Sequence, residues 1–351
     1  MRELAGKMKI AILACSNGLG HVRRVIAISS YILRSGFKGN ITAFLPSSHL
    51  EILGNWTETK YFLNHPSVSI CDFKYPIIPD RKTKSLFEKK WLQIDLPNLD
   101  DFDVVWSDNI TQVLKDRPDA IITGSFFWHE VFSHSNHNSE LQEFIIEQRE
   151  LIRKTEPIIA GNEYFSTPEI KNVKRFCPVG LYRYNITFKE KKENNILLSC
   201  GLGGEEEDVT KTALQRIIEE NLKPPKTLFV EKRILPNSYP SWIEKADFSD
   251  NMFHNCLAVC IRPGMGTISD SLVNRTRIFS FSTENSFEME YNSKILEKLG
   301  VGESCKNPYD SYRKALEFIS DNDKVELQIF RTSHLRTDGV LATAKLITGN
   351  Y

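Results

Sequence analysis

A histidine closes the first glycine-containing turn of the chain, in the stretch Gly18-Leu19-Gly20-His21. The turn follows an apolar run from Lys9 to Cys15 that is typical of a buried strand. In open α/β sheets, ligands bind beyond the carboxyl ends of the strands, and an imidazole there can take a proton near neutral pH. The pattern therefore predicts a general base at His21. A tight strand-to-helix turn in which the histidine only caps the helix would give the same pattern.

Asp108 follows a second predicted strand, which runs from Asp103 to Trp106 and ends in Ser107-Asp108-Asn109. Its carboxylate would either orient His21 or cap the helix that follows, because Asp and Asn both favour caps. The sequence leaves both roles open. A further pair, His129 and Glu130, follows another predicted strand. We favour a place on the surface of a helix over a role in the site.

A second glycine-rich turn follows the apolar run from Leu257 to Ile261, which predicts a short buried strand. The residues that end this strand are Arg262, Pro263, Gly264 and Gly266. We expect Thr267 or Ser269 to cap a helix that carries Asp270 in its first turn. Such a turn presents free backbone N–H groups and the positive end of a helix dipole, which suits a phosphate. A carboxylate one turn into the helix would accept two hydrogen bonds from a ribose diol.

These residues carry a resemblance to a known family. The segment RPGMGTISD, followed further on by EMEYNSKILEKLGVG, resembles the donor-sugar half of the GT-B glycosyltransferases, and most of all the peptidoglycan N-acetylglucosaminyltransferase and its relatives. In that family the helix after the glycine-rich turn holds a diphosphate at its N-terminus and places an acidic residue on the ribose, a position that Asp270 matches. The family usually carries paired Gln, or Asp-Gln, in the next loop to hold the sugar. This chain has Glu288, Met289 and Glu290 there, so the resemblance does not name the donor sugar.

The resemblance also bears on the N-terminal half. In the GT-B family, and in the related UDP-sugar hydrolase of pseudaminic acid synthesis, a histidine at this Gly-x-Gly-His position acts as a base or lies in the acceptor site. Plant-type members pair it with an aspartate, which fits His21 and Asp108 as the expected catalytic residues. The residues expected on the acceptor side are Asn17, Gly18, Gly20, Asn162 and Glu163. The residues expected to bind the donor are Gly201, Gly203, Arg262, Gly264, Met265, Gly266, Thr267, Asp270, Glu288 and Asn292.

We expect neither a metal site nor a cofactor. The stretch Asp101-Phe102-Asp103 spells the Asp-x-Asp of metal-dependent glycosyltransferases, but it precedes its strand, whereas a metal site needs it after the strand. We interpret it as a turn and cap, and the GT-B family needs no metal. The acidic run from Glu205 to Asp208 follows a glycine turn, and we expect it to face solvent because it would otherwise repel a diphosphate.

Apolar runs separated by helical stretches predict parallel sheets, and each half of the chain opens with a buried strand and a glycine-rich turn. We therefore expect an α/β protein with two Rossmann-like domains facing across a cleft. The expected divisions are residues 1–180 for the acceptor and 181–335 for the nucleotide sugar. The resemblance to the GT-B family implies that a helix in 336–351 crosses back to the first domain. Residues 46–98 are expected to be irregular, with a strand near 68–73.

Composition narrows the possible partners. The chain has 351 residues, with 45 Lys and Arg against 45 Asp and Glu, so its zero net charge argues against nucleic acid. Its apolar runs are too short for a membrane span or a signal peptide. The seven cysteines are odd in number, scattered and without CxxC spacing, and most lie in or beside apolar segments, so we expect a cytoplasmic protein with reduced thiols. The basic cluster from Arg81 to Lys90 leaves open a peripheral contact with anionic lipid, although a solvated loop is the favoured explanation.

Taken together, the sequence predicts a metal-independent, inverting glycosyltransferase that uses a nucleotide-diphosphate sugar, with a UDP-sugar favoured. The acceptor would be a sugar, a lipid-linked sugar or a small molecule with a free hydroxyl. A nucleotide-sugar hydrolase or epimerase on the same scaffold, or a non-catalytic nucleotide-sugar-binding protein, are the alternatives.

Overall fold

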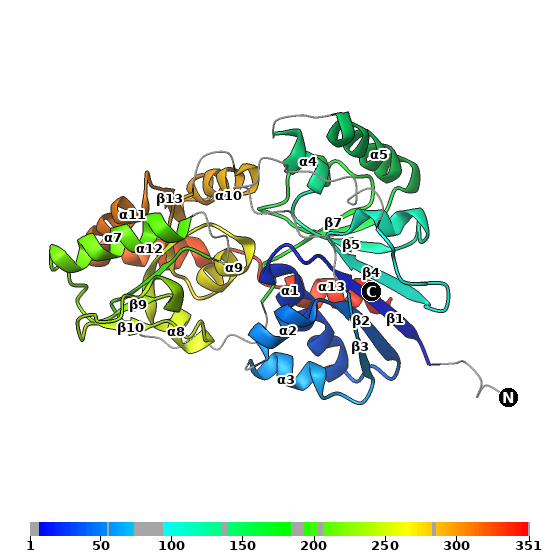
Figure 1. Cartoon of the computed structure of the whole chain (residues 1–351), viewed down its shortest axis with the longest axis horizontal. Helices are drawn as coiled ribbons and strands as arrows, with labels where there is room; N and C mark the ends of the chain where they lie inside the picture. The colour runs from blue at the N-terminus through cyan, green and yellow to red at the C-terminus, as the bar shows by residue number, and fades with distance from the viewer. Residues whose placement is uncertain are drawn as a thin grey trace. The chain divides into compact units, whose positions relative to one another are not determined.

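The computed structural model describes residues 7–54, 56–73, 94–134, 139–183, 193–201, 206–282 and 286–349. The chain divides into two compact units. The N-terminal unit comprises Met1–Tyr184 and Asp338–Tyr351, and the C-terminal unit comprises Asn185–Thr337. Each unit is a parallel sheet with helices around it (Figure 1).

The sheet of the N-terminal unit has the strand order β3-β2-β1-β4-β5-β6-β7. Its strands are β1 (Lys9–Ala14), β2 (Asn40–Leu45), β3 (Val68–Asp72), β4 (Val104–Asp108), β5 (Ile121–Thr123), β6 (Ile158–Asn162) and β7 (Phe176–Val179). All described pairs in this sheet are parallel. The order reverses between β1 and β4, which makes the carboxyl ends of these two strands the topological switch point, where open α/β sheets bind ligands.

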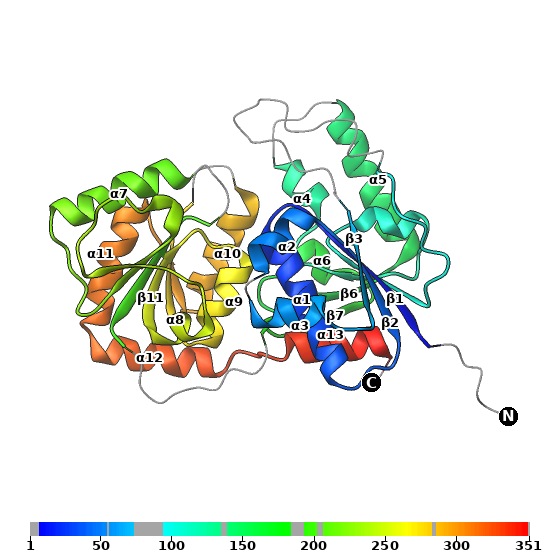
Figure 2. The same cartoon turned by 60° about the horizontal axis from the view of Figure 1, so that its bottom comes forward.

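Helices cover both faces of this sheet because the central strands are apolar on both sides. The helical segments are α1 (Leu19–Arg34), α2 (Ser47–Leu53), α3 (Thr57–Leu63), η2 (Thr111–Lys115), α4 (Trp128–Ser133), α5 (Ser139–Thr155), α6 (Pro168–Lys171) and α13 (Gly339–Thr348). Ile10 and Ile12 of β1 pack in one cluster with α1, α2, α3 and α13, whereas Ala11 and Leu13 pack in another with α4 and α5. Figure 2 shows α1 and α13 on the same side of the sheet.

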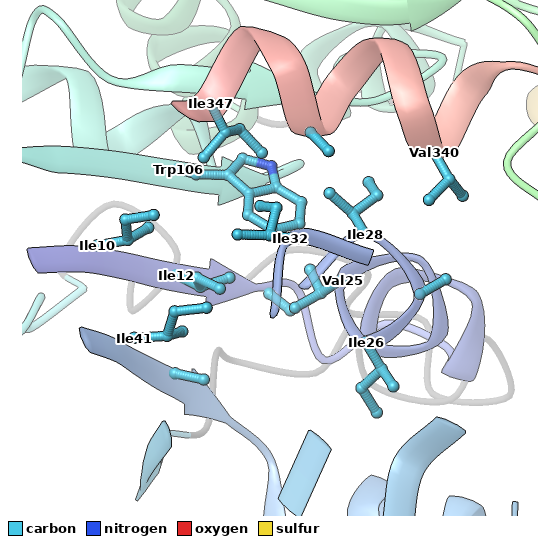
Figure 3. Packing of buried hydrophobic residues seen from close by; sticks show 14 of the residues in the cluster. Ile10, Ile12, Val25, Ile26, Ile28, Ile32, Ile41, Trp106, Val340 and Ile347 are labelled. Atoms are coloured by element: carbon cyan, nitrogen blue, oxygen red, sulfur yellow. The ribbon is translucent and has the colours of Figure 1, made fainter. Parts of the chain in front are cut away.

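Figure 3 shows how α13 completes the first of these clusters. Val340 and Ile347 of α13 lie close to Ile28 and Ile32 of α1, with the indole of Trp106 beside them. All of these side chains are almost fully buried. The core of the N-terminal unit is therefore shared between its first helix and a helix that follows the whole C-terminal unit in the sequence.

The sheet of the C-terminal unit has the order β10-β9-β8-β11-β12-β13, and its described pairs are also parallel. Its strands are β8 (Asn195–Ser199), β9 (Leu228–Val230), β10 (Ile243–Lys245), β11 (Cys256–Ile261), β12 (Arg277–Ser280) and β13 (Gly302–Ser304). Its helical segments are α7 (Glu207–Glu219), η4 (Lys232–Ile234), α8 (Asp250–Asn255), α9 (Met265–Val273), α10 (Phe287–Lys298), α11 (Pro308–Ile319) and α12 (Asn322–Ser333). Here the order reverses between β8 and β11.

The structure corrects several expected elements. Residues 46–98 are not wholly irregular, because α2 and α3 lie within them. The first helix begins at Leu19, so His21 lies in its first turn and not in the preceding loop. Residues 288–290 belong to α10 and not to a loop. The basic cluster from Arg81 to Lys90 lies outside the described residues.

All seven cysteines are free thiols. Within the described part of the chain, no helix is both long enough and apolar enough to span a bilayer.

Candidate active site

His21 is held at the start of α1 by the geometry of the preceding residue. Gly18 is the N-cap of α1 and has φ 121° and ψ 149°, a conformation that is open essentially to glycine alone. From there the chain turns directly from β1 into the helix. His21 is only 9% exposed, and its Nδ1 lies 2.7 Å from Oδ1 of Asp108, the last residue of β4.

The strand register brings these groups together. Ala14 is the β1 partner of Asp108, and Thr123 is its β5 partner. The hydroxyl of Thr123 donates to Oδ2 of Asp108 at 2.7 Å and accepts a hydrogen bond from the indole Nε1 of Trp106 at 3.0 Å. The His21–Asp108 pair therefore lies at the switch point of the N-terminal sheet.

Asp108 is fully buried, and a buried carboxylate must be compensated. Arg24 supplies the counter-charge, with Nε 2.6 Å from Oδ2 and Nη2 2.8 Å from Oδ1. Burial alone would raise the pKa of Asp108, but the charge and hydrogen bonds of Arg24, together with the bond to His21, lower this pKa to about 2. Asp108 is consequently a carboxylate at neutral pH.

The ionisation of Asp108 decides which imidazole nitrogen carries the proton. A carboxylate only accepts hydrogen bonds, so Nδ1 of neutral His21 is the protonated nitrogen and donates to Asp108. The lone pair then lies on Nε2, the nitrogen that points away from Asp108. This is the tautomer of a general base.

His49 on α2 is electrostatically coupled to this pair. Burial and then the charge of His21 lower the pKa of His49 below its ordinary value. Within the described residues, Nδ1 of His49 is buried without a hydrogen-bond partner. His49 was not singled out from the sequence, because nothing in its local pattern predicts that α2 approaches α1.

The residues expected on the acceptor side fall into two groups. Asn17, Gly18 and Gly20 lie in the β1–α1 connection or at the start of α1, next to His21. Asn162 instead is fully buried at the end of β6, where its Nδ2 donates to the carbonyl of Gly180 at 2.9 Å and its Oδ1 accepts from two backbone N–H groups. This bonding orders the loop that contains Glu163, whose side chain is half-buried.

His129 and Glu130 are not on the surface, contrary to the expectation from the sequence. His129 is 1% exposed, and its Nε2 lies 2.6 Å from Oε1 of Glu169. Glu130 accepts hydrogen bonds from the backbone of Phe127 and the hydroxyl of Thr167, both at 2.8 Å. These contacts fix the start of α4 against α6, which gives the pair a structural role.

In the C-terminal unit, the turn after β11 leads into α9. Gly264 is the N-cap of this helix, so neither Thr267 nor Ser269 caps it as expected. The first N–H groups of α9, those of Met265, Gly266 and Thr267, lack acceptors within the helix. Together with the helix dipole they form an anion-binding end.

Asp270 does not lie in the first turn of α9, contrary to the expectation. The helix begins at Met265, which places Asp270 in its second turn, and the residue is only 1% exposed. Asp270 therefore does not lie at the positive end of the helix dipole. A role on the ribose stays a prediction.

The glycine turn after β8 is partly described. Gly201 has φ 67°, and Gly203 lies outside the described residues. The acidic run does not face solvent throughout, because Glu206 is 2% exposed and its Oε1 lies 3.4 Å from Nε of Arg262. The guanidinium of Arg262, from the turn after β11, thus compensates the carboxylate of Glu206, which we expected to face solvent.

The expected sugar-binding segment is the first part of α10. Met289 is buried in the core, and Glu288 is half-buried. Asn292 is 1% exposed and donates from Nδ2 to the carbonyl of Pro263 at 2.9 Å. Asn292 therefore connects α10 to the turn that precedes α9 and helps to fix the position of the anion-binding end of α9.

Other possible ligand sites are a metal site and a hollow in the N-terminal unit. Among the described residues, no group of three or more His, Cys, Asp or Glu side chains is placed to hold a metal ion. Asp103 of the Asp-x-Asp stretch accepts a hydrogen bond from the backbone N–H of Lys9 at 2.7 Å. A hollow lined by Lys9, Asn40 and Asp101 lies at the amino ends of the strands, at the opposite edge from His21.

Arg24 and Thr123 are the site residues that the sequence did not reveal. Arg24 stands three residues after His21, a spacing that places both on one face of a helix. That signal becomes readable once His21 is known to lie inside α1. Thr123 has no such signal, since its role follows from strand register.

Comparison with known proteins identifies the fold. Neither the models of protein families nor the curated protein sequences include a match to this chain. Solved structures do match over nearly the full length. The glycotransferase of kitacinnamycin superposes with a TM-score of 0.66 and 14% identity, covering 97% of this chain and 98% of that one.

Two plant proteins match in the same way. A UDP-glucosyltransferase from Polygonum tinctorium capable of glucosylating indoxyl has a TM-score of 0.65 and 10% identity, covering 98% of this chain and 99% of its own. Arabidopsis thaliana UGT89C1, solved in complex with UDP, has a TM-score of 0.58 and 12% identity over the same shares. The chain has the GT-B fold of these proteins, with two Rossmann-like units, as the sequence predicted.

Proposed function

We propose that this chain is a glycosyltransferase that moves a sugar from a nucleotide-diphosphate sugar to an acceptor hydroxyl. The observation that carries the proposal is the His21–Asp108 pair at the switch point of the N-terminal sheet, in a chain that shares its fold with glycosyltransferases. A UDP-sugar is the favoured donor, because a similar protein is named a UDP-glucosyltransferase and another was solved with UDP.

In the proposed reaction, Nε2 of His21 takes the proton of the acceptor hydroxyl. The acceptor oxygen forms a bond to the anomeric carbon as the bond from that carbon to the diphosphate breaks, and the nucleoside diphosphate leaves with the electron pair. Asp108 stabilises the imidazolium that forms, through the hydrogen bond at Nδ1. Direct attack from the side opposite the leaving group inverts the configuration.

The donor would bind the C-terminal unit. The N–H groups of Met265, Gly266 and Thr267 and the dipole of α9 would stabilise the diphosphate, with Arg262 adding positive charge. We propose that these groups take the place of a metal ion. Asp270 would accept hydrogen bonds from the ribose hydroxyls.

The test separates chemistry from donor binding with two variants. Nucleoside diphosphates and nucleotide sugars are first screened by thermal shift, since a ligand at 100 times its Kd stabilises by about 2.7 kcal/mol. With the best donor, His21→Gln should lower kcat by roughly 10²- to 10⁴-fold and leave donor Kd unchanged. Asp270→Asn should raise donor Kd about 10- to 150-fold, the worth of a charge-assisted hydrogen bond.

Each alternative function predicts a different product pattern. Release of free sugar that no acceptor suppresses would show a hydrolase, and a changed sugar configuration on an intact nucleotide would show an epimerase. Donor binding without any turnover would show a sensor. Loss of donor affinity in His21→Gln would contradict the assignment of His21 as the acceptor-side base.

A further inference from the structure

Arg24 grips both oxygens of Asp108 from the same helix that carries His21. The two N–H···O contacts of 2.6 and 2.8 Å form a bidentate pair, and the guanidinium carbon lies 5.0 Å from the centre of the Tyr182 ring. The Arg24 side chain is 9% exposed. Two hydrogen bonds and an aromatic face thus fix the position of the guanidinium.

This arrangement places a permanent positive charge beside the imidazole. Nη2 of Arg24 lies 3.4 Å from Nδ1 of His21, and both groups contact Oδ1 of Asp108. A guanidinium has no acceptor, and Nδ1 already donates to Asp108 at the shorter distance of 2.7 Å. The 3.4 Å approach is therefore a contact between a cation and an imidazole and not a hydrogen bond.

The charges of the cluster follow from these contacts. With neutral His21, an isolated His–Asp pair would carry one negative charge, which favours the imidazolium. Arg24 cancels that charge, so protonation of His21 leaves the buried cluster with a net positive charge. Because the cluster has little contact with solvent, a net positive charge on it is unfavourable.

We infer that Arg24 is a positioning residue that neutralises Asp108 and thereby reduces the electrostatic stabilisation that this carboxylate gives to the imidazolium form of His21. The catalytic consequence rests on the proposed function, but the effect on His21 does not. Arg24 would touch neither donor nor acceptor.

The other titratable groups considered around His21, all among the described residues, do not supply the same charge. Burial raises the pKa of Cys15 to about 12 and raises that of Tyr182 further above its ordinary value, so both are neutral. Thr123 is uncharged, and His49 has a lowered pKa. The charged residues of the helices packed on α1 are half-buried Glu58 and exposed Glu51, Lys60 and Lys345. Arg23, the neighbour on α1, instead lies over the Trp56 ring at 3.9 Å.

Direct titration of His21 tests this inference without any assay of activity. The ring proton and carbon signals of His21 are followed against pH by NMR in the full chain, with His21→Gln identifying them among the eight histidines. In Arg24→Gln the titration midpoint should rise by about 1 to 2 pH units, because a like charge is removed and Asp108 is left uncompensated. Arg24→Lys keeps a cation and should stay closer to the wild type.

Arg23→Gln is the matched control, because it removes the same charge one residue away and should leave the midpoint of His21 unchanged. An unchanged or lower midpoint in folded Arg24→Gln would overturn the inference. If that variant does not fold, Arg24→Gln is combined with Asp108→Asn, which removes both buried charges. Its midpoint must then lie above that of Asp108→Asn alone, and an equal or lower value would also overturn the inference.

Activity measurements separate this inference from the proposed function. The acidic limb of the kcat/KM profile should move to higher pH in Arg24→Gln, together with the NMR midpoint, which a purely structural role would not produce. A shifted midpoint in a protein that transfers no sugar would refute the function and support the role of Arg24. Normal transfer with an unshifted midpoint would refute the role of Arg24 alone.

Discussion

Among the described residues of the N-terminal unit, Asp108 and Glu130 are buried carboxylates whose surroundings shift their pKa values in opposite directions. Asp108 faces a guanidinium, and its pKa is lowered to about 2. Within the described residues, Glu130 accepts hydrogen bonds from neutral groups, the backbone of Phe127 and the hydroxyl of Thr167, and burial raises its pKa to about 7. Near neutral pH the first is fully ionised and the second is about half protonated.

Glu130 should therefore make stability depend on pH. The carboxyl of Glu130 binds its proton more tightly in the folded chain than in the unfolded one, so its contribution to stability falls as pH rises from about 4.5 to 7 and levels off above the folded pKa. Glu130→Gln keeps an acceptor for Phe127 and Thr167 and cannot ionise. We expect this variant to exceed the wild type in unfolding free energy at pH 8, by up to about 3 kcal/mol, and to approach it at pH 5.

Urea unfolding at the two pH values measures the difference. Glu150→Gln on the exposed side of α5 controls for the loss of one negative charge. An equal change at pH 5 and pH 8 in Glu130→Gln would mean that the carboxyl is already ionised in the folded protein.

At the scale of elements, the start of α1 depends on one glycine and not on the other. Gly18 has φ 121°, whereas Gly20 has ordinary helical geometry and open space around the position of a Cβ atom. Gly18→Ala should destabilise the fold by about 1–3 kcal/mol, the cost of forcing a side chain into this conformation, and should lower activity by displacing His21. Gly20→Ala should leave stability within about 0.5 kcal/mol of the wild type.

Thermal unfolding and the His21 ring signals of both variants decide this. Equal destabilisation by the two substitutions would show that helix entry does not depend on the conformation of Gly18.

The elements also show which parts of the fold sequence reasoning can reach. The apolar runs of β1, β8 and β11 are five to six residues long and buried along most or all of their length, so their pattern reveals them. β10 and β13 are three-residue strands of sequence IEK and GES at the two edges of their sheet. Their strand conformation comes from pairing with β9 and β12, which no local pattern encodes.

The residues of the candidate site also differ in how far the local sequence pattern predicts their contacts. The sequence leaves two roles open for Asp108, a contact with His21 or a helix cap. The contact can be anticipated because both residues follow predicted buried strands. The burial of Glu206 was missed, because its counter-charge, Arg262, comes from a distant turn. The sequence shows where charges are, whereas their pairing depends on which turns the sheet brings together.

At the scale of the whole molecule, the donor and acceptor groups are assigned to different units. A nucleoside diphosphate should therefore slow hydrogen exchange in the C-terminal unit, at the β11–α9 turn from Arg262 to Thr267, where it would bind backbone N–H groups. We expect no comparable change in α1. Mass spectrometry of the exchanged peptides checks this, with Asp270→Asn as the control that weakens protection at equal ligand concentration. Protection confined to peptides of the N-terminal unit would place the nucleotide site there.

The placement of α13 has a consequence for synthesis on the ribosome. Val340, Ala344 and Ile347 belong to the same buried cluster as Ile12 and Trp106, yet residues 185–337 are translated between them. The C-terminal unit is contiguous in sequence and can fold as soon as it emerges. The N-terminal unit, although translated first, lacks the part of this cluster that α13 supplies until α13 arrives, whereas α1, α2 and α3 can already pack on the same face of the sheet. The nascent chain therefore exposes the apolar surface that α13 covers, including part of α1 and of Trp106, through most of its synthesis, which is the interval when a chaperone would bind it.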